Sequence, residues 1–297
     1  MAQAQHDYEQ LGFKFDKGGH FPEGEFNSIV SFQKNSHLEL LSVSESPSIK
    51  KGVASMIADF LKKQEGAMFL GIDVSSAKAA ADYLKARNFD VSGLIPGSVM
   101  KEGETTPPPP MWYSVLPADE PAAGKKGIIL PIFFIEYVSS ERREKSRAAG
   151  EMDQPNTAMG IHAVWFAVHD TQAQLRTLRD AGLESGEARE ARFLSAHGRE
   201  VKAGQGVLLL LESSDKSGPL TEYLSEHKNW IDGWPHDEGT IGLSIEVADL
   251  SKARQLAESG TGRKLETYKG FYGMSFLLPR EVTHGVWIEM FQVEKSH

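Results

Sequence analysis

The clearest structural signal in this chain is the stretch Ile241-Gly-Leu-Ser-Ile-Glu-Val247. It is followed by Asp249 and a helix-like segment that ends at Gly260. Its apolar run is typical of a buried strand. Asp249 fits a helix N-cap, because its side-chain oxygen can accept hydrogen bonds from the first free amides of a helix. Leu250 and Leu256 belong to an apolar stripe at helical spacing after this cap. The stretch therefore predicts one strand followed by one amphipathic helix.

The same order of strand, cap, helix and stop occurs at two other places. It runs over residues 69–88, with Ser76 as the expected cap, and over residues 161–182, with Asp170 in that role. Each copy is followed by a second apolar strand, expected at residues 131–137, 207–212 and 285–291. Such self-similarity predicts one structural unit used repeatedly.

A fourth copy at the N-terminus is partial. Residues 2–12 read as its helix, and 27–32 and 38–41 as two of its strands, but an opening strand is missing. We expect an upstream start; the alternatives are that the strand was lost or that a partner chain supplies it. The unpaired sheet edge that results favours association, so a homodimer is possible. No charged-then-apolar leader opens the chain, which favours the cytoplasm, provisionally, since an upstream start would also carry any targeting signal.

A polar segment separates the two pairs of copies. Residues 139–158 contain five consecutive charged side chains, at positions 141–145, and we place the boundary between the halves here. The prolines of residues 102–110 predict a loop, because proline lacks the amide that a β-ladder needs. Residues 219–231 predict one more helix, with Pro219 at its first position.

Composition limits the possible partners. The chain has 297 residues, no cysteine and a formal net charge of −9, so disulfides and thiolate metal sites are excluded and a nucleic-acid partner is not expected. The longest apolar run, residues 128–135, is far shorter than the ~20 residues of a membrane helix, and no membrane partner is expected. A small-molecule substrate or ligand is the expected partner, and any metal must be held by His, Asp or Glu.

Several short motifs carry a family resemblance: Leu11-Gly-Phe13, Gly18-Gly-His20, Gly24-Glu-Phe-Asn27, His37-Leu-Glu-Leu-Leu41 and Pro131-Ile-Phe-Phe-Ile-Glu136. Together with the repeat they resemble a glyoxalase-like domain of the vicinal oxygen chelate superfamily, which includes glyoxalases, bleomycin-resistance proteins and extradiol dioxygenases. The resemblance implies an α+β fold of four βαβββ modules, the first lacking its opening strand, paired into two incomplete-barrel domains. These would be an N-terminal module pair over 1–140 and a C-terminal pair over 159–297.

The resemblance also implies a divalent metal, Zn, Ni, Mn or Fe, held by a histidine from the first strand and a glutamate from the last strand of each module. Glu39, Glu136 and Glu289 stand at the closing-strand position, and His162 stands at a first-strand position. The pattern is broken at Phe69, Leu209 and Gly242. Further histidines that could supplement the ligands are His20 in the first half and His197, His236 or His284 in the second.

Alternatives remain open for these residues. Without a metal, Glu39 and Glu136 would face each other as a general acid and a general base, with His20 as a further catalytic candidate. His162 could be a core histidine, and the face that carries Glu289 could lie in solvent. Three functions follow from the resemblance. The protein is expected to be a metal-dependent lyase, isomerase or dioxygenase. The alternatives are a non-catalytic ligand-sequestering protein of the bleomycin-resistance type and a degenerate scaffold.

Overall fold

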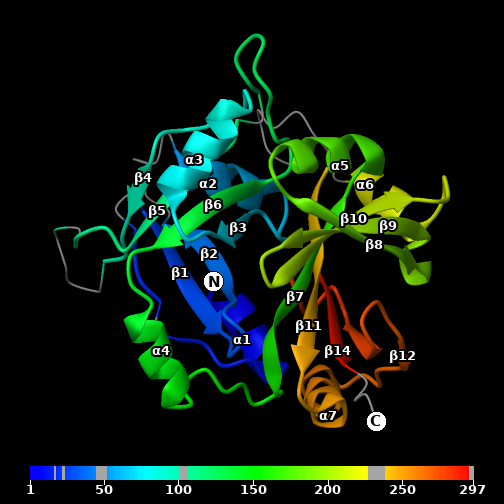
Figure 1. Cartoon of the computed structure of the whole chain (residues 1–297). Helices are drawn as coiled ribbons and strands as arrows, with labels where there is room; N and C mark the ends of the chain where they lie inside the picture. Colours follow the sequence, from blue (N-terminus) through cyan, green and yellow to red (C-terminus); the bar gives the residue numbers. More distant parts are fainter. Residues whose placement is uncertain are drawn as a thin grey trace.

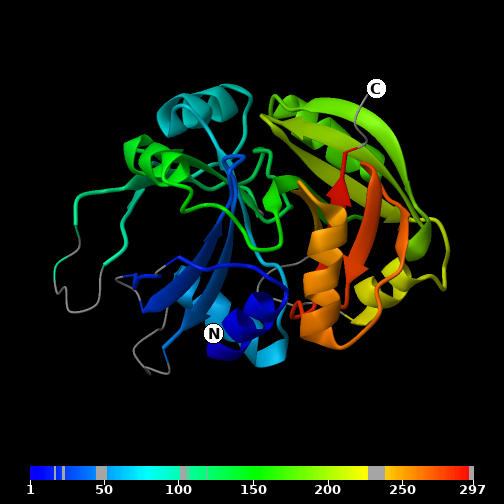
Figure 2. The same ribbon diagram turned by 90° about the horizontal axis from the view of Figure 1, so that it is seen from below.

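The computed structural model describes residues 1–293, except residues 17, 22–23, 45–51, 101–105, 107, 119 and 227–237. Figures 1 and 2 show an N-terminal half beside a C-terminal half. The elements of the first half are α1 (Ala2–Gln10), β1 (Glu25–Ser31), β2 (His37–Val43), α2 (Val53–Lys63), β3 (Leu70–Asp73), α3 (Ala77–Ala86), β4 (Ile95–Gly97), β5 (Trp112–Val115), β6 (Ile132–Tyr137) and α4 (Glu141–Ala148).

The second half begins at β7 (Ala158–Ala167). It continues with α5 (Thr171–Asp180), β8 (Glu184–Ala191), the 3-10 helix η1 (Arg192–Leu194), β9 (Ala196–Ala203), β10 (Gly206–Ser213), α6 (Pro219–Glu226), β11 (Gly239–Val247), α7 (Leu250–Thr261), β12 (Thr267–Lys269), β13 (Met274–Leu278) and β14 (Trp287–Gln292). None of the helices among the described residues combines the length and the apolar character that crossing a membrane requires.

The C-terminal half contains two complete modules joined edge to edge. Its single eight-stranded sheet has the order β12-β13-β14-β11-β7-β10-β9-β8. Within each module the first strand pairs in parallel with the last, β7 with β10 and β11 with β14. The two first strands, β7 and β11, pair antiparallel through a bulged register. The α+β fold of paired βαβββ modules is confirmed here.

The N-terminal half repeats this plan with two separate sheets. The second module forms a sheet of order β3-β6-β5-β4, in which β3 again runs parallel to β6. The first module contributes the antiparallel pair β1-β2, and among the described residues no strand pairs with the outer edge of β2 or β3. The partial first module is confirmed, whereas association into a homodimer stays a prediction.

The predicted caps begin the three helices that follow a first strand. Each capping oxygen accepts a hydrogen bond from the third helical amide: Ser76 from Ala79, Asp170 from Ala173 and Asp249 from Lys252. The predicted helix over 219–231 is present as α6 up to Glu226, and its remainder lies outside the described residues. The expected loop at 102–110 is likewise described only in part.

The two halves share one hydrophobic core. Tyr8 and Phe32 of the first half belong to the same buried cluster as Val164 and Met290 of the second. Helix α1 packs against α7, which lies between the N-terminal half and the eight-stranded sheet (Figure 2). The halves thus meet through buried side chains. The domain boundaries 1–140 and 159–297 stay a prediction.

Candidate functional site

Glu39 lies on the side of the β1-β2 pair that faces away from α1. Ser28 contacts α1 through its hydroxyl, and Glu39 pairs with the next residue, Ile29, so its side chain points to the opposite side. The Nδ2 atom of Asn27 donates a hydrogen bond of 2.7 Å to Oε1 of Glu39, and Oδ1 of Asn27 accepts one of 2.8 Å from the amide of Gly19. Burial raises the pKa of Glu39, and the hydrogen bond from Asn27 partly opposes this.

Tyr137 of β6 brings a second group of side chains to Glu39. The ring centroids of Tyr137 and His37 lie 6.3 Å apart, and Cζ of Arg143 lies 4.5 Å from the centre of the Tyr137 ring. Burial raises the pKa of Tyr137 to about 12; Arg143 opposes the shift, and Glu39 and Asp73 add to it. Burial and the charge of Arg143 lower the pKa of His37 to about 4. At neutral pH the phenol is therefore protonated and the imidazole uncharged.

We call the surface that carries Asn27, His37, Glu39, Tyr137 and Arg143 the N-terminal inner face. It is built from three strands of two modules, β1, β2 and β6, and from α4. Sequence reasoning missed His37, Tyr137 and Arg143. A signal existed for His37, which precedes Glu39 by two positions on one strand and so shares its side. Tyr137 was missed because Glu136, its neighbour on the strand, was expected on the inner side.

Glu136 does not belong to this face. Its Oε2 atom accepts a hydrogen bond of 2.8 Å from the amide of Ala77, the first residue of α3. Neighbouring residues of a strand point to opposite sides, so Glu136 lies on the helix side and Tyr137 on the inner side. The prediction that Glu39 and Glu136 face each other is wrong, because Glu136 binds the N-terminus of a helix.

The repeat shows why the prediction failed. Glu212 of the third module and Gln292 of the fourth accept hydrogen bonds from the first amides of α5 and α7, at 2.8 and 3.3 Å. Glu136 is thus the equivalent of these two residues. Glu289 lies three positions before Gln292, so its counterpart in the second module is Phe133. The closing-strand position of the second module is therefore Phe133, three residues before the predicted Glu136.

Glu289 is fully buried in the C-terminal half. Its Oε2 atom accepts a hydrogen bond of 2.7 Å from Ser244, and its Oε1 atom accepts one of 3.2 Å from the amide of Phe271 and one of 3.3 Å from the hydroxyl of Tyr268. Ser244 in turn accepts a 2.9 Å hydrogen bond from Trp165. Burial raises the pKa of Glu289, and the hydrogen bonds lower it. The alternative that this face lies in solvent is wrong.

His162 lies among aromatic rings. Its ring centroid is 4.3 Å from that of Tyr272 and 5.5 Å from that of Phe291. Burial lowers its pKa, which Glu246 and Glu200 partly oppose. Glu200 forms a nearby ion pair with Arg189, at 2.6 Å between Oε1 and Nε. Glu200 pairs with Leu209, the residue that stands where the family pattern expects a glutamate. Sequence reasoning missed Glu200 because it sits on the neighbouring strand, β9.

Among the described residues, the supplementary histidines form no side-chain hydrogen bond, ion pair or ring contact with Glu39, His162 or Glu289. His20 is exposed and pairs with Met100 through backbone hydrogen bonds of 3.0 and 2.8 Å. His197 is exposed on β9. His284 contacts two carboxylates, Nδ1 to Glu65 at 2.7 Å and Nε2 to Asp7 at 3.0 Å. His236 lies outside the described residues.

The described residues do not fit the family-type divalent metal. Within the part of the chain that the structure describes, no three His, Asp or Glu side chains gather closely enough to hold a metal ion. Both oxygens of Glu289 are engaged, and a Cβ atom on Gly270 would lie 1.9 Å from Oε1, so the surrounding chain closes tightly on this carboxylate. A carboxylate that binds a metal needs an oxygen that can approach the ion, and the hydrogen bonds and close packing around Glu289 leave no room for one.

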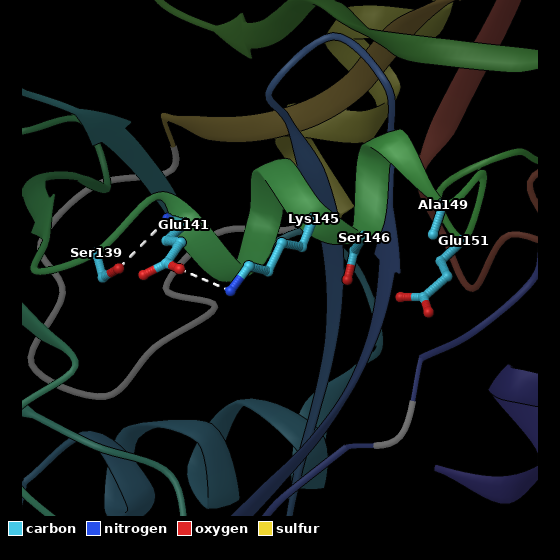
Figure 3. Close-up of a pocket in the computed structure, with 6 residues that line it drawn as sticks. All are labelled: Ser139, Glu141, Lys145, Ser146, Ala149 and Glu151. Atoms are coloured by element: carbon cyan, nitrogen blue, oxygen red, sulfur yellow. Dashed lines mark hydrogen bonds and ion pairs between the residues drawn. The ribbon is translucent and has the colours of Figure 1, made fainter.

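A hollow of about 470 Å³ lies along one side of α4 (Figure 3). Glu141 and Lys145, which form an ion pair of 2.6 Å, point into it together with Ser146 and Glu151. Arg143 is not among the residues that line it. Helix α4 therefore presents one side to this hollow and another to Tyr137.

The repeated βαβββ modules and their pairing define a protein of the vicinal oxygen chelate superfamily. More narrowly, the sequence pattern of the glyoxalase-like domain matches residues 1–204, and the chain belongs to that family. Curated proteins provide no match.

One solved structure supports the fold. A hypothetical protein from Staphylococcus aureus is 12% identical and aligns over 95% of this chain and 90% of its own, with a TM-score of 0.58. Methylmalonyl-CoA epimerase from Mycobacterium tuberculosis is 16% identical over 46% of this chain and 90% of its own, with a TM-score of 0.40. The methylmalonyl-CoA epimerase of Streptomyces coelicolor in complex with 2-nitronate-propionyl-CoA is 20% identical. It covers 45% of this chain and 96% of its own, with a TM-score of 0.37.

Proposed function

We propose that the protein binds a small oxygenated molecule at the N-terminal inner face and that Glu39 transfers a proton to or from it. This is the isomerase or lyase type of chemistry among the activities that the family resemblance implies. One observation carries the proposal: Asn27 holds Oε1 of Glu39, and among the described residues Oε2 has no hydrogen bond partner. Both oxygens of Glu289, by contrast, are engaged.

The chemistry follows from the neighbours of Glu39. A carboxylate in a half-buried site with a raised pKa is a suitable general base near neutral pH. The protonated hydroxyl of Tyr137 and the uncharged ring of His37 can donate hydrogen bonds to a carbonyl oxygen of the bound molecule. Glu39 would accept a proton from the carbon beside that carbonyl and return it.

The test is exchange of carbon-bound hydrogen with solvent. The protein is incubated in D2O with a panel of 2-oxo acids, hydroxyketones and acyl thioesters, and deuterium incorporation is followed by proton NMR. We expect incorporation into at least one probe and a loss of about 100-fold or more in Glu39→Gln, because general acid–base groups contribute about 10²–10⁴-fold. Glu136→Gln, the matched control on β6, should keep the rate. Equal rates in wild type and Glu39→Gln would refute the role of Glu39.

A second candidate function is ligand sequestration without chemistry, as in bleomycin-resistance proteins. The aromatic side chains near the inner face favour it, since His37 packs on Tyr137 and Phe21 lies 6.1 Å from Trp112, edge to face. Probes that bind to the protein without any deuterium incorporation would support this function instead.

A further inference from the structure

We propose that Arg143 is the anion-binding residue of the N-terminal inner face and that the molecule bound there carries a carboxylate. The inference rests on the proposed function, because it names the class of small molecule that reaches Glu39. It concerns a residue that the sequence had placed in a charged segment between the halves. Helix α4 instead carries this side chain to the aromatic ring of Tyr137.

The guanidinium of Arg143 donates a hydrogen bond to the side chain of Tyr137, and its other donors have no close acceptor among the described residues. Its Cζ atom lies 4.5 Å from the centre of the Tyr137 ring, an arrangement that holds the cation against the aromatic side chain. Nη1 of Arg143 lies 3.7 Å from Oδ2 of Asp73, which is longer than a hydrogen bond, and the side chain of Asp73 is 54% exposed. Arg143 itself is 28% exposed, so a small molecule can reach it.

The local charges favour a carboxylate as the ligand. Tyr137 and His37 are uncharged at neutral pH, so neither of them repels an anion at Arg143. The carboxylate of a ligand can form two charge-assisted hydrogen bonds with the guanidinium group of Arg143. The exposed carboxylate of Asp73 forms neither of them, because it lies 3.7 Å away. Arg143 lies against the ring of Tyr137, Tyr137 packs against His37, and His37 precedes Glu39 by two residues on β2. A short acid held at Arg143 would therefore lie on the same face as Glu39.

Arg147, a further arginine of α4, has a different role. Nε of Arg147 donates a hydrogen bond of 3.0 Å to the carbonyl of Gln33, and its Nη2 atom contacts Asn35, so Arg147 fastens α4 to the turn between β1 and β2. A suitable control lies elsewhere. Cζ of Arg87 lies 3.5 Å from the centre of the Tyr83 ring at the end of α3, an exposed arginine on tyrosine outside the inner face.

The experiment compares matched acids and amides. Pairs such as phenylacetate and phenylacetamide, pyruvate and pyruvamide, and lactate and lactamide are measured for binding to the full chain by saturation-transfer NMR and calorimetry. We expect acids to bind and their amides to bind at least about tenfold more weakly. Arg143→Met should weaken acid binding by about tenfold or more without changing amide binding. Asp73→Asn should tighten acid binding, and Arg87→Met should leave both unchanged.

Three results would overturn the inference: amides that bind as tightly as their acids, acid binding that survives Arg143→Met, or no binding of any acid. Circular dichroism of each variant establishes that it is folded. Failure of the inference is separable from failure of the proposed function. Deuterium exchange that depends on Glu39, together with amides that bind as tightly as their acids, would keep Glu39 and dismiss Arg143, whereas acid binding through Arg143 without exchange would do the reverse.

Discussion

Replacement of Glu136 separates two roles for the same residue: a catalytic group, as its sequence position suggests, or a residue that binds a helix N-terminus, as its contact shows. Its carboxylate accepts a 2.8 Å hydrogen bond from the amide of Ala77 at the start of α3. A hydrogen bond to a charged group contributes about 1.5–3 kcal/mol, and a carboxylate at a helix N-terminus gains about 0.3–1 kcal/mol from the helix dipole. Water takes over part of the lost interaction at this half-buried site. We therefore expect Glu136→Ala to lower the free energy of unfolding by about 1–2 kcal/mol, and Glu136→Gln, which keeps an acceptor, by about 0.5 kcal/mol.

Urea unfolding monitored by circular dichroism measures these differences, and the deuterium-exchange assay measures chemistry in the same samples. Glu212→Ala is the matched control, because Glu212 binds the amide of Thr171 at the same distance of 2.8 Å in the next module. Both alanine variants should lose similar stability. Loss of exchange in Glu136→Gln with stability unchanged would show that the carboxylate reaches the bound molecule, and the capping interpretation would then be abandoned.

Three further predictions concern stability. The pKa of His37 is about 4 in the folded protein and 6.5 in the unfolded chain, so the unfolded state binds more protons between these values. The free energy of unfolding should therefore fall by up to about 3 kcal/mol as the pH drops from 6.5 toward 4. Urea unfolding across this range should show a weaker pH dependence in His37→Gln. Glu289→Ala should cost at least about 2 kcal/mol in urea unfolding, because it leaves several buried donors without an acceptor, and Glu289→Gln should cost less. Gly260→Ala should lower the melting temperature, since its Cβ atom would lie 2.0 Å from the carbonyl oxygen of Gln10, whereas Gly93→Ala, with open space around it, should not.

Local sequence signals predicted the modules well. A strand, a cap and an amphipathic helix are each specified within about twelve residues, and the three caps form the hydrogen bonds expected of them. The helix α2 was missed, although Ala54, Ile57 and Phe60 form its buried side. It occurs once and belongs to none of the repeated modules, so the repeat pattern does not predict it.

The candidate site was predicted less completely, because it depends on register. A displacement of three residues along β6 exchanges Glu136 for Phe133 and moves a carboxylate from the inner side to the helix side. The apolar run of residues 131–135 offers no alternation that would reveal this error. Arg143 was missed for another reason: its partner Tyr137 lies on a different element, and a run of charged residues in sequence does not show which member turns inward.

The two halves use the same position of the fold in different ways, and burial accounts for the difference. In the C-terminal half, Trp165, Leu209, Phe271 and Leu220 of α6 form a second buried cluster on the side of the sheet that carries Glu289. Any bound molecule would have to displace these side chains, at about 25 cal/mol for each Å² of apolar surface returned to water. In the N-terminal half every residue of β2 is only half-buried, so Glu39 can be reached without such displacement. A carboxylate with both oxygens engaged in a closed core stabilises the fold, and one with a free oxygen on an open face is available for chemistry. The N-terminal half is therefore where binding and proton transfer should be sought.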